Sequence, residues 1–187
     1  MTRPVSPINI PNILTVVRIL LVPVFVILLM RNLYPHALAV FILAGVSDGL
    51  DGFIARYFNQ RTDLGAYLDP LADKLLLVCA YTTLAVLKII PAWIAVLVIA
   101  RDVIIIMGIA VLALTEKPYR IRPTLLSKCN TSCQIIFIVL ALFDPIHIRL
   151  AHWYTAMLWL TTAMTILSGM HYIVIGMKIL QAPDEID

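Results

Sequence analysis

Charged residues are scarce in this sequence. Lysine, arginine, aspartate and glutamate make up 13% of its 187 residues, whereas hydrophobic residues make up 61%. Soluble domains carry about 25% charged residues, so this composition excludes an ordinary soluble domain and favours a protein embedded in a lipid bilayer. The net charge of +3 is also too small for nucleic-acid binding by bulk electrostatics, and we expect no nucleic-acid partner.

Cysteine is scarce too. The three cysteines, Cys79, Cys129 and Cys133, all lie in apolar sequence, which excludes the disulfide framework that staples small secreted domains. Cys129 and Cys133 are four residues apart and would share a helix face, but no histidine or third cysteine accompanies them in that stretch. We interpret them as small packing residues rather than as metal ligands.

The hydrophobic residues are gathered in six runs that could each cross a membrane, which takes about 20 residues. The runs predict helices over about 13–31, 34–57, 63–88, 91–114, 124–142 and 153–180. Prolines 4, 7 and 11 interrupt residues 1–12, which predicts a short interfacial segment rather than a span or a cleavable signal peptide. The expected fold is an all-α integral membrane protein, with residues 1–187 forming one domain of six transmembrane helices.

Four aspartates interrupt the second and third of these runs: Asp48, Asp51, Asp69 and Asp73. A carboxylate inside a membrane helix is costly and points to a functional site. The spacings of three and four residues place each pair on one helix face. In an antiparallel hairpin that turns near residue 60, all four carboxylates converge, and the small residues Ala55 and Gly65 meet beside them.

Four carboxylates need counter-charges in a low-dielectric pocket. The only cations adjacent to them in sequence are Arg56 and Lys74. Hard divalent ions bind all-oxygen ligand sets, and four carboxylates can hold two such ions about 4 Å apart, as in phosphoryl-transfer sites. The pattern therefore predicts a site for two divalent cations, Mg²⁺ or Mn²⁺.

The full motif is Asp48-x2-Asp51-Gly52-x2-Ala55-Arg56-x8-Gly65-x3-Asp69-x3-Asp73, and these eight positions with their gaps match the signature of the CDP-alcohol phosphotransferases. The chain thus resembles this family of integral membrane enzymes. The resemblance implies cleavage of the pyrophosphate of CDP-diacylglycerol, transfer of the phosphatidyl group to an alcohol, and release of CMP. It also implies a homodimer.

The resemblance further implies roles for individual residues. Two divalent metals would be held by the aspartates, namely Asp48, Asp51, Asp69 and Asp73. Asp73 would also act as the base that activates the attacking hydroxyl. The nucleotide and diphosphate would be bound by Asp48, Gly52, Ala55, Arg56 and Gly65.

Basic residues in the second half of the chain are candidates for binding the acceptor. Arg101 and Asp102 lie near the middle of an apolar helix, where they would form a structural ion pair or line the cavity, with Arg101 facing an anionic group. Arg120, Arg122 and Lys128 lie in and after the most basic loop. These three would attract anionic headgroups, at about 1 kcal/mol each, or bind a phosphate of the acceptor, and the two interpretations are compatible.

The identity of the acceptor alcohol is predicted from two short segments. IARD at 99–102 and RPTLLSKCNTSCQ at 122–134 resemble cardiolipin synthases, whose acceptor is phosphatidylglycerol. Phosphatidylglycerophosphate synthases, which use glycerol 3-phosphate, tend to carry Ala-Arg-Glu and Gly-Lys-x-Lys-Thr there. We expect synthesis of cardiolipin and CMP, with phosphatidylglycerophosphate synthesis as the alternative.

A third candidate function is divalent cation transport, because buried aspartates also mark ion paths. A path would need polar residues beyond the aspartates, and the far halves of the helices over 34–57 and 63–88 offer almost none. We therefore favour the enzyme.

The flanking charges predict the topology. Eight basic residues flank the helices on the side of the termini: Arg3, Arg56, Arg61, Lys117, Arg120, Arg122, Lys128 and Lys178. Three flank them on the other side: Arg31, Lys88 and Arg149. By the positive-inside rule, both termini and the opening of the aspartate cavity face the cytoplasm, in a multi-pass protein of the bacterial cell membrane.

Overall fold

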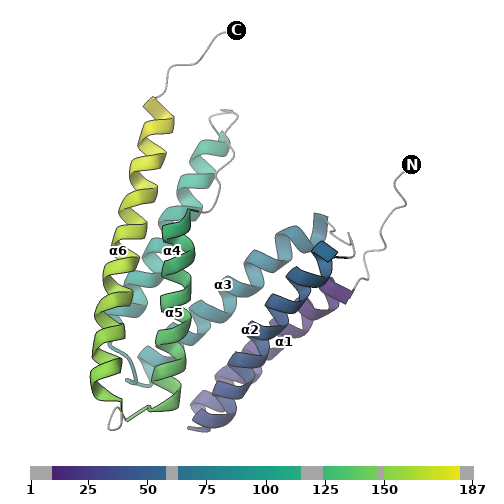
Figure 1. The fold of residues 1–187 in the computed structure, drawn as a ribbon, viewed down its shortest axis with the longest axis vertical. Helices are drawn as coiled ribbons and strands as arrows, with labels where there is room; N and C mark the ends of the chain where they lie inside the picture. The colour runs from purple at the N-terminus through teal and green to yellow at the C-terminus, as the bar shows by residue number, and fades with distance from the viewer. Residues whose placement is uncertain (1–9, 58–62, 115–123, 147–149, 182–187) are drawn as a thin grey trace. The chain divides into compact units, whose positions relative to one another are not determined.

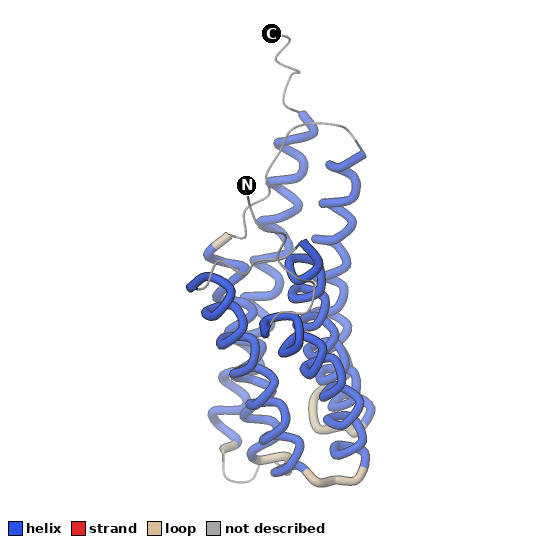
Figure 2. The backbone as a smooth tube through the Cα atoms, turned by 90° about the vertical axis from the view of Figure 1, so that its right-hand side faces the viewer, coloured by secondary structure: helices blue, strands red, loops and turns tan. Residues whose placement is uncertain are grey.

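The computed structural model describes residues 10–57, 63–114, 124–146 and 150–181, and within these it leaves undescribed the side chains of residues 10–12, 49–57, 63–71, 112–114 and 180. Every regular element in the described part is a helix (Figures 1 and 2). The elements are α1 (Ile10–Met30), α2 (Tyr34–Tyr57), α3 (Asp63–Val86), α4 (Ala92–Leu114), α5 (Leu125–Phe143) and α6 (Ala151–Gln181). The predicted all-helical fold with six helices is confirmed.

The predicted and observed helix starts differ most for α1, which begins at Ile10 and was predicted to begin near residue 13. Pro11 therefore lies in the first turn, where proline is tolerated because its missing N–H would have no partner inside the helix. Residues 10–12 of the predicted interfacial segment thus belong to the helix. Residues 1–9 of that predicted segment lie outside the described residues.

The helix α3 ends at Val86, two residues before the predicted end, because a specific backbone motif terminates it. Lys88 adopts a left-handed conformation with φ 59°, its N–H donates to the carbonyl of Ala85, and the N–H of Ile89 donates to the carbonyl of Leu84, both at 3.0 Å. This pair of bonds is a Schellman motif, which satisfies carbonyls left open at a helix end. Helix α1 ends in the same way, with Asn32 at φ 58°.

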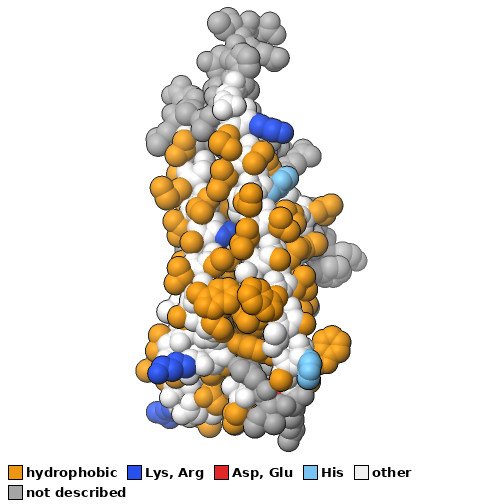
Figure 3. All heavy atoms as spheres, turned by 90° about the vertical axis from the view of Figure 1, so that its left-hand side faces the viewer, with side chains coloured by type: hydrophobic (Ala, Val, Ile, Leu, Met, Phe, Trp, Pro, Cys, Tyr) orange, Lys and Arg blue, Asp and Glu red, His pale blue; other side chains and the backbone are white. Residues whose placement is uncertain are grey.

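Helices α1, α4, α5 and α6 are long and apolar enough to cross a membrane over their described residues. The most apolar window, Ile13–Met30, has a mean hydropathy of 2.9. Large hydrophobic side chains such as Leu20, Val96 and Trp159 are exposed, and Figure 3 shows hydrophobic side chains gathered over the middle of one face. Such a surface suits lipid rather than water, so the chain is a multi-pass membrane protein.

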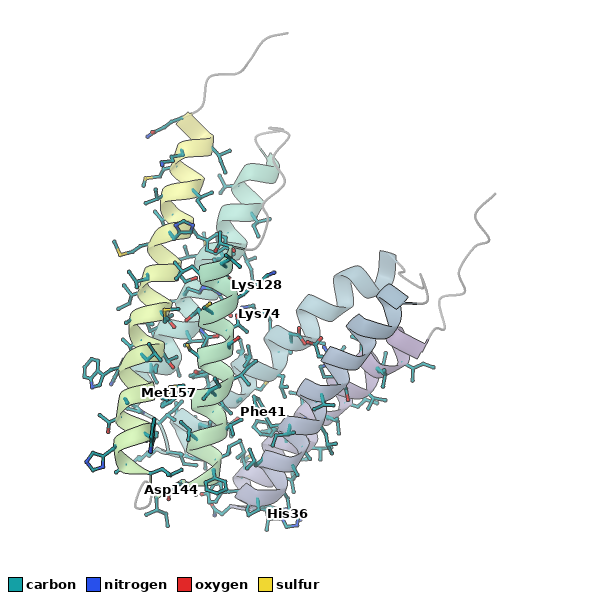
Figure 4. All side chains as sticks on the ribbon, in the orientation of Figure 1. His36, Phe41, Lys74, Lys128, Asp144 and Met157 are labelled. Atoms are coloured by element: carbon teal, nitrogen blue, oxygen red, sulfur yellow. The ribbon has the colours of Figure 1, made fainter. Side chains whose placement is uncertain are left out.

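The chain forms two compact units, residues 1–90 with 142–146, and residues 91–141 with 147–187. In the first unit α1 packs against both α2 and α3. The rings of Phe25 on α1 and Phe41 on α2 are tilted relative to each other, with a centroid distance of 5.7 Å; Figure 4 labels Phe41. Ala80, Tyr81 and Leu84 of α3 are fully buried in the same core.

In the second unit α4 packs against α6, and α5 is joined to α6 by polar contacts. The Thr165 hydroxyl donates to Asn130 Oδ1 at 2.9 Å, and the Thr161 hydroxyl donates to the carbonyl of Cys133 at 3.4 Å. The Phe137 and Tyr154 rings lie 5.3 Å apart. In lipid, where apolar surface gives no driving force between helices, buried hydrogen bonds of this kind help to fix helix pairs.

Candidate active site

Asp48 of α2 and Asp73 of α3 meet at a single cation, Arg18 of α1. Arg18 Nη1 lies 2.8 Å from Asp48 Oδ1 and 2.5 Å from Asp73 Oδ1. The Arg18 side chain is 0% exposed, whereas the side chains of Asp48 and Asp73 are 43% and 42% exposed. The guanidinium therefore lies behind the two carboxylates, and the carboxylates face the open side.

The packing of α1 explains how Arg18 reaches this point. Val22, Phe25 and Leu29 form the buried stripe of α1, and Arg18 continues that stripe one turn toward the N-terminus with the period of a helix. Thr15, one turn further, is also fully buried. Helix α1 contacts both α2 and α3. The buried stripe of α1 therefore also places the Arg18 guanidinium between the two helices that carry the aspartates.

Sequence reasoning missed this role of Arg18. It sought counter-charges next to the aspartates in the sequence, whereas Arg18 and Asp73 are separated by 55 residues. The available signal was the residue itself, since an arginine inside a window of mean hydropathy 2.9 requires an internal partner.

The structure brings together two of the four predicted metal ligands, Asp48 and Asp73. Their meeting follows the predicted register of the α2–α3 hairpin. The side chains of the other predicted metal and nucleotide residues lie outside the described part: Asp51, Asp69, Gly52, Ala55, Arg56 and Gly65. Among the described residues, no group of three or more His, Cys, Asp or Glu side chains comes together.

The described part of the site fits a hard divalent cation. Carboxylate oxygens from two helices converge on one guanidinium nitrogen, and two negative groups with one positive group leave a net negative charge there. Half-exposed carboxylates keep lone pairs available on their open side, and an all-oxygen donor set suits Mg²⁺ or Mn²⁺.

The second unit holds a second buried arginine, Arg101 of α4. Its Nη1 donates to Asp102 at 2.7 Å, its Nη2 donates to Ser127 of α5 at 2.7 Å, and both Nε and Nη2 donate to Ser168 of α6. The ring of Tyr172 lies 5.7 Å from the guanidinium carbon. Arg101 thus ties three helices together, and the ion pair with Asp102 expected from the sequence is present.

Arg101 also lines a mostly apolar groove of about 430 Å³ between α4 and α6. The ion-pair interpretation of Arg101 is therefore confirmed, whereas lining of the aspartate cavity by Arg101 stays a prediction. Of the other candidate acceptor residues, Lys128 is exposed on α5 (Figure 4). Arg120 and Arg122 lie outside the described residues.

The buried Arg101–Asp102 pair gives a prediction for stability. Arg101→Ala should lower the free energy of unfolding by about 3–5 kcal/mol, because it leaves the Asp102 charge buried without its main counter-ion. The measurement is unfolding of the purified variant in detergent micelles. Lys178→Ala, which removes an exposed cation from the last turn of α6, is the control and should change stability little. Equal stability of the two variants would contradict the prediction.

The comparison against known families agrees with the resemblance that the eight-position motif indicates. The family model "CDP-alcohol phosphatidyltransferase" matches residues 8–167. The chain belongs to this family. Membership of a CDP-alcohol phosphatidyltransferase family favours an enzyme over the cation transporter considered from the sequence.

The relatives of this chain include two kinds of enzyme. It is similar to the cardiolipin synthase (CMP-forming) of Homo sapiens, with 38% identity over 176 residues that cover 86% of this chain and 58% of the human protein. It is also similar to the CDP-diacylglycerol–glycerol-3-phosphate 3-phosphatidyltransferase of Bacillus subtilis, with 32% identity that covers 88% of this chain and 93% of that protein. The chain spans a little over half the length of the mammalian relatives.

Proposed function

We propose that this membrane protein is a cardiolipin synthase, which transfers the phosphatidyl group of CDP-diacylglycerol to phosphatidylglycerol and releases CMP. The observation that carries the proposal is the contact between the two segments whose sequence resembles cardiolipin synthases. Arg101 and Asp102 of the first segment form an ion pair, and Arg101 donates to Ser127 of the second at 2.7 Å. Arg101, Asp102 and Ser127, which come from the two segments, thus form one cluster.

The charge of this cluster supports a lipid acceptor. Arg101 is neutralised by Asp102, and Asn130, fully buried in the same unit, is uncharged. Aligned with the phosphatidylglycerophosphate synthase pattern, Ser127 corresponds to glycine and Asn130 to lysine. The phosphate monoester of glycerol 3-phosphate carries more charge than the phosphodiester of phosphatidylglycerol, and an additional lysine would serve it.

In the proposed reaction, a hydroxyl of the acceptor attacks the phosphorus next to diacylglycerol, and the bond from that phosphorus to the CMP oxygen breaks. Asp73 accepts the hydroxyl proton. Asp48, Asp51, Asp69 and Asp73 would hold two divalent cations, which would offset the charge that develops on the diphosphate. The remaining binding residues are Gly52, Ala55, Arg56 and Gly65 for the nucleotide, and Arg101, Arg120, Arg122 and Lys128 for the acceptor.

The proposed enzyme is a homodimer in the bacterial cell membrane, with six spans, both termini in the cytoplasm and the active-site cavity open to the same side. The basic residues flanking the helices support this orientation. This orientation agrees with CDP-diacylglycerol as the donor, because its nucleotide is made in the cytoplasm and its acyl chains stay in the bilayer.

The proposal is tested by supplying the purified protein with CDP-diacylglycerol and either phosphatidylglycerol or glycerol 3-phosphate, and by resolving the lipid products. Cardiolipin formed from phosphatidylglycerol, together with CMP, is the expected result. Product from glycerol 3-phosphate alone would establish the alternative, phosphatidylglycerophosphate synthesis, which the Bacillus subtilis relative favours.

The contact cluster also predicts how the acceptor preference can be changed. The triple substitution Asp102→Glu, Ser127→Gly and Asn130→Lys should raise the use of glycerol 3-phosphate relative to phosphatidylglycerol by about tenfold or more, because a hydrogen bond to a charged group contributes about 1.5–3 kcal/mol. The ratio of kcat/KM values for the two acceptors measures this change. Ser132→Ala, at an exposed hydroxyl of α5, is the control. An unchanged ratio in a folded triple variant would show that these positions do not select the acceptor.

A further inference from the structure

We infer that Arg18 is a positioning residue of the metal site: it holds one oxygen of Asp48 and one of Asp73 so that the open side of both carboxylates is set for a divalent cation. The inference rests on the proposed function, in which these aspartates are metal ligands. It adds a residue from α1 that lies outside the family motif of α2 and α3.

Arg18 and the two carboxylates differ in how deeply they are buried. Arg18 is 0% exposed while both carboxylates are more than 40% exposed, so the guanidinium approaches them from the protein interior. It contacts the Oδ1 atom of each. A cation arriving from the open side meets carboxylates that are already oriented from behind.

Arg18 joins two different helices of the site. Asp48 and Asp73 belong to different helices, α2 and α3, and each would otherwise repel the other across the gap. A single nitrogen at 2.8 Å and 2.5 Å from their oxygens removes this repulsion and fixes the separation of the two helices at the level of the site. Arginine suits this task because its planar group stays charged and holds several directed hydrogen bonds.

The packing of α1 fixes Arg18 itself in place. It extends the stripe of Val22, Phe25 and Leu29, whose side chains are buried against the core of the unit. Partners that orient metal ligands from behind typically contribute 10–100-fold to metal affinity. We therefore assign this magnitude to Arg18.

The test measures Mn²⁺ binding to the purified protein in lipid nanodiscs by electron paramagnetic resonance, without substrate. Arg18→Gln should bind Mn²⁺ about 10–100-fold more weakly than the wild type. The Mn²⁺ affinity of Arg18→Lys should lie between those of Arg18→Gln and the wild type, because an ammonium is a compact charge without the planar fork of arginine. Arg31→Gln, which removes an exposed arginine just after α1, should bind as the wild type does.

Each outcome has a definite reading. Folded Arg18→Gln protein that binds Mn²⁺ as tightly as the wild type, or more tightly, overturns the inference, because Arg18 would then be a purely structural residue or a competitor of the metal. If Arg18→Gln does not fold, Arg18→Lys is decisive, and wild-type affinity in that variant contradicts the positioning role. Failure of the wild type itself to bind Mn²⁺ would instead count against the metal site in the proposed function.

Discussion

Asp73→Asn is expected to lower the turnover of CDP-diacylglycerol by about 10³-fold or more, with binding of the CDP-lipid partly retained. An amide cannot accept the proton of the acceptor hydroxyl, and general bases typically contribute about 10²–10⁴-fold. The same change removes one negative charge from the proposed metal ligands, which adds to the loss. Release of CMP under saturating substrate measures the effect.

We expect this variant to fold, because the ion pair of Arg18 with Asp48, 2.8 Å long in this structure, does not involve Asp73. Thr82→Val is the matched control, because Thr82 is exposed on the same helix, away from the aspartates. It should keep the turnover of the wild type. Turnover of Asp73→Asn within a few-fold of that control would exclude Asp73 as the base.

Removal of divalent cations is expected to abolish the activity completely and reversibly. Without cations the carboxylates cannot bind a diphosphate, because the negative charges of the two groups repel each other. Addition of Mg²⁺ or Mn²⁺ after chelation should restore CMP release. A parallel measurement of thermal unfolding should show that the chelated protein stays folded, because the ion pairs of Arg18 with Asp48 and Asp73 need no metal. Full activity after exhaustive chelation would contradict the metal-dependent reaction.

Helix positions were the most predictable part of the fold. The apolar runs have the length of a bilayer crossing, and the predicted bounds of α2, 34–57, agree with those in the structure. The end of α3 was missed because it depends on a left-handed residue at Lys88, which is neither a glycine nor an asparagine and so gave no signal in the sequence.

The candidate site was predictable where its parts are close in sequence. Asp48 and Asp73 lie on helices that are consecutive in the sequence, so the register of a predicted hairpin was sufficient to bring them together. Arg18 was not predictable in this way, because its position follows from the packing of α1 against both helices. The partners of Arg101 on α6 were missed for the same reason, since Ser168 is 67 residues away.

The central claim is that the acidic side chains of α2 and α3 together bind divalent cations at the reacting diphosphate. An experimental structure of the protein in lipid with Mn²⁺ and CDP-diacylglycerol, with the metal located by its anomalous scattering, tests it most directly. The account predicts manganese bound by oxygens of Asp48 and Asp73, with Arg18 behind them. Carboxylates that point apart, or a diphosphate bound without metal near either residue, would contradict it.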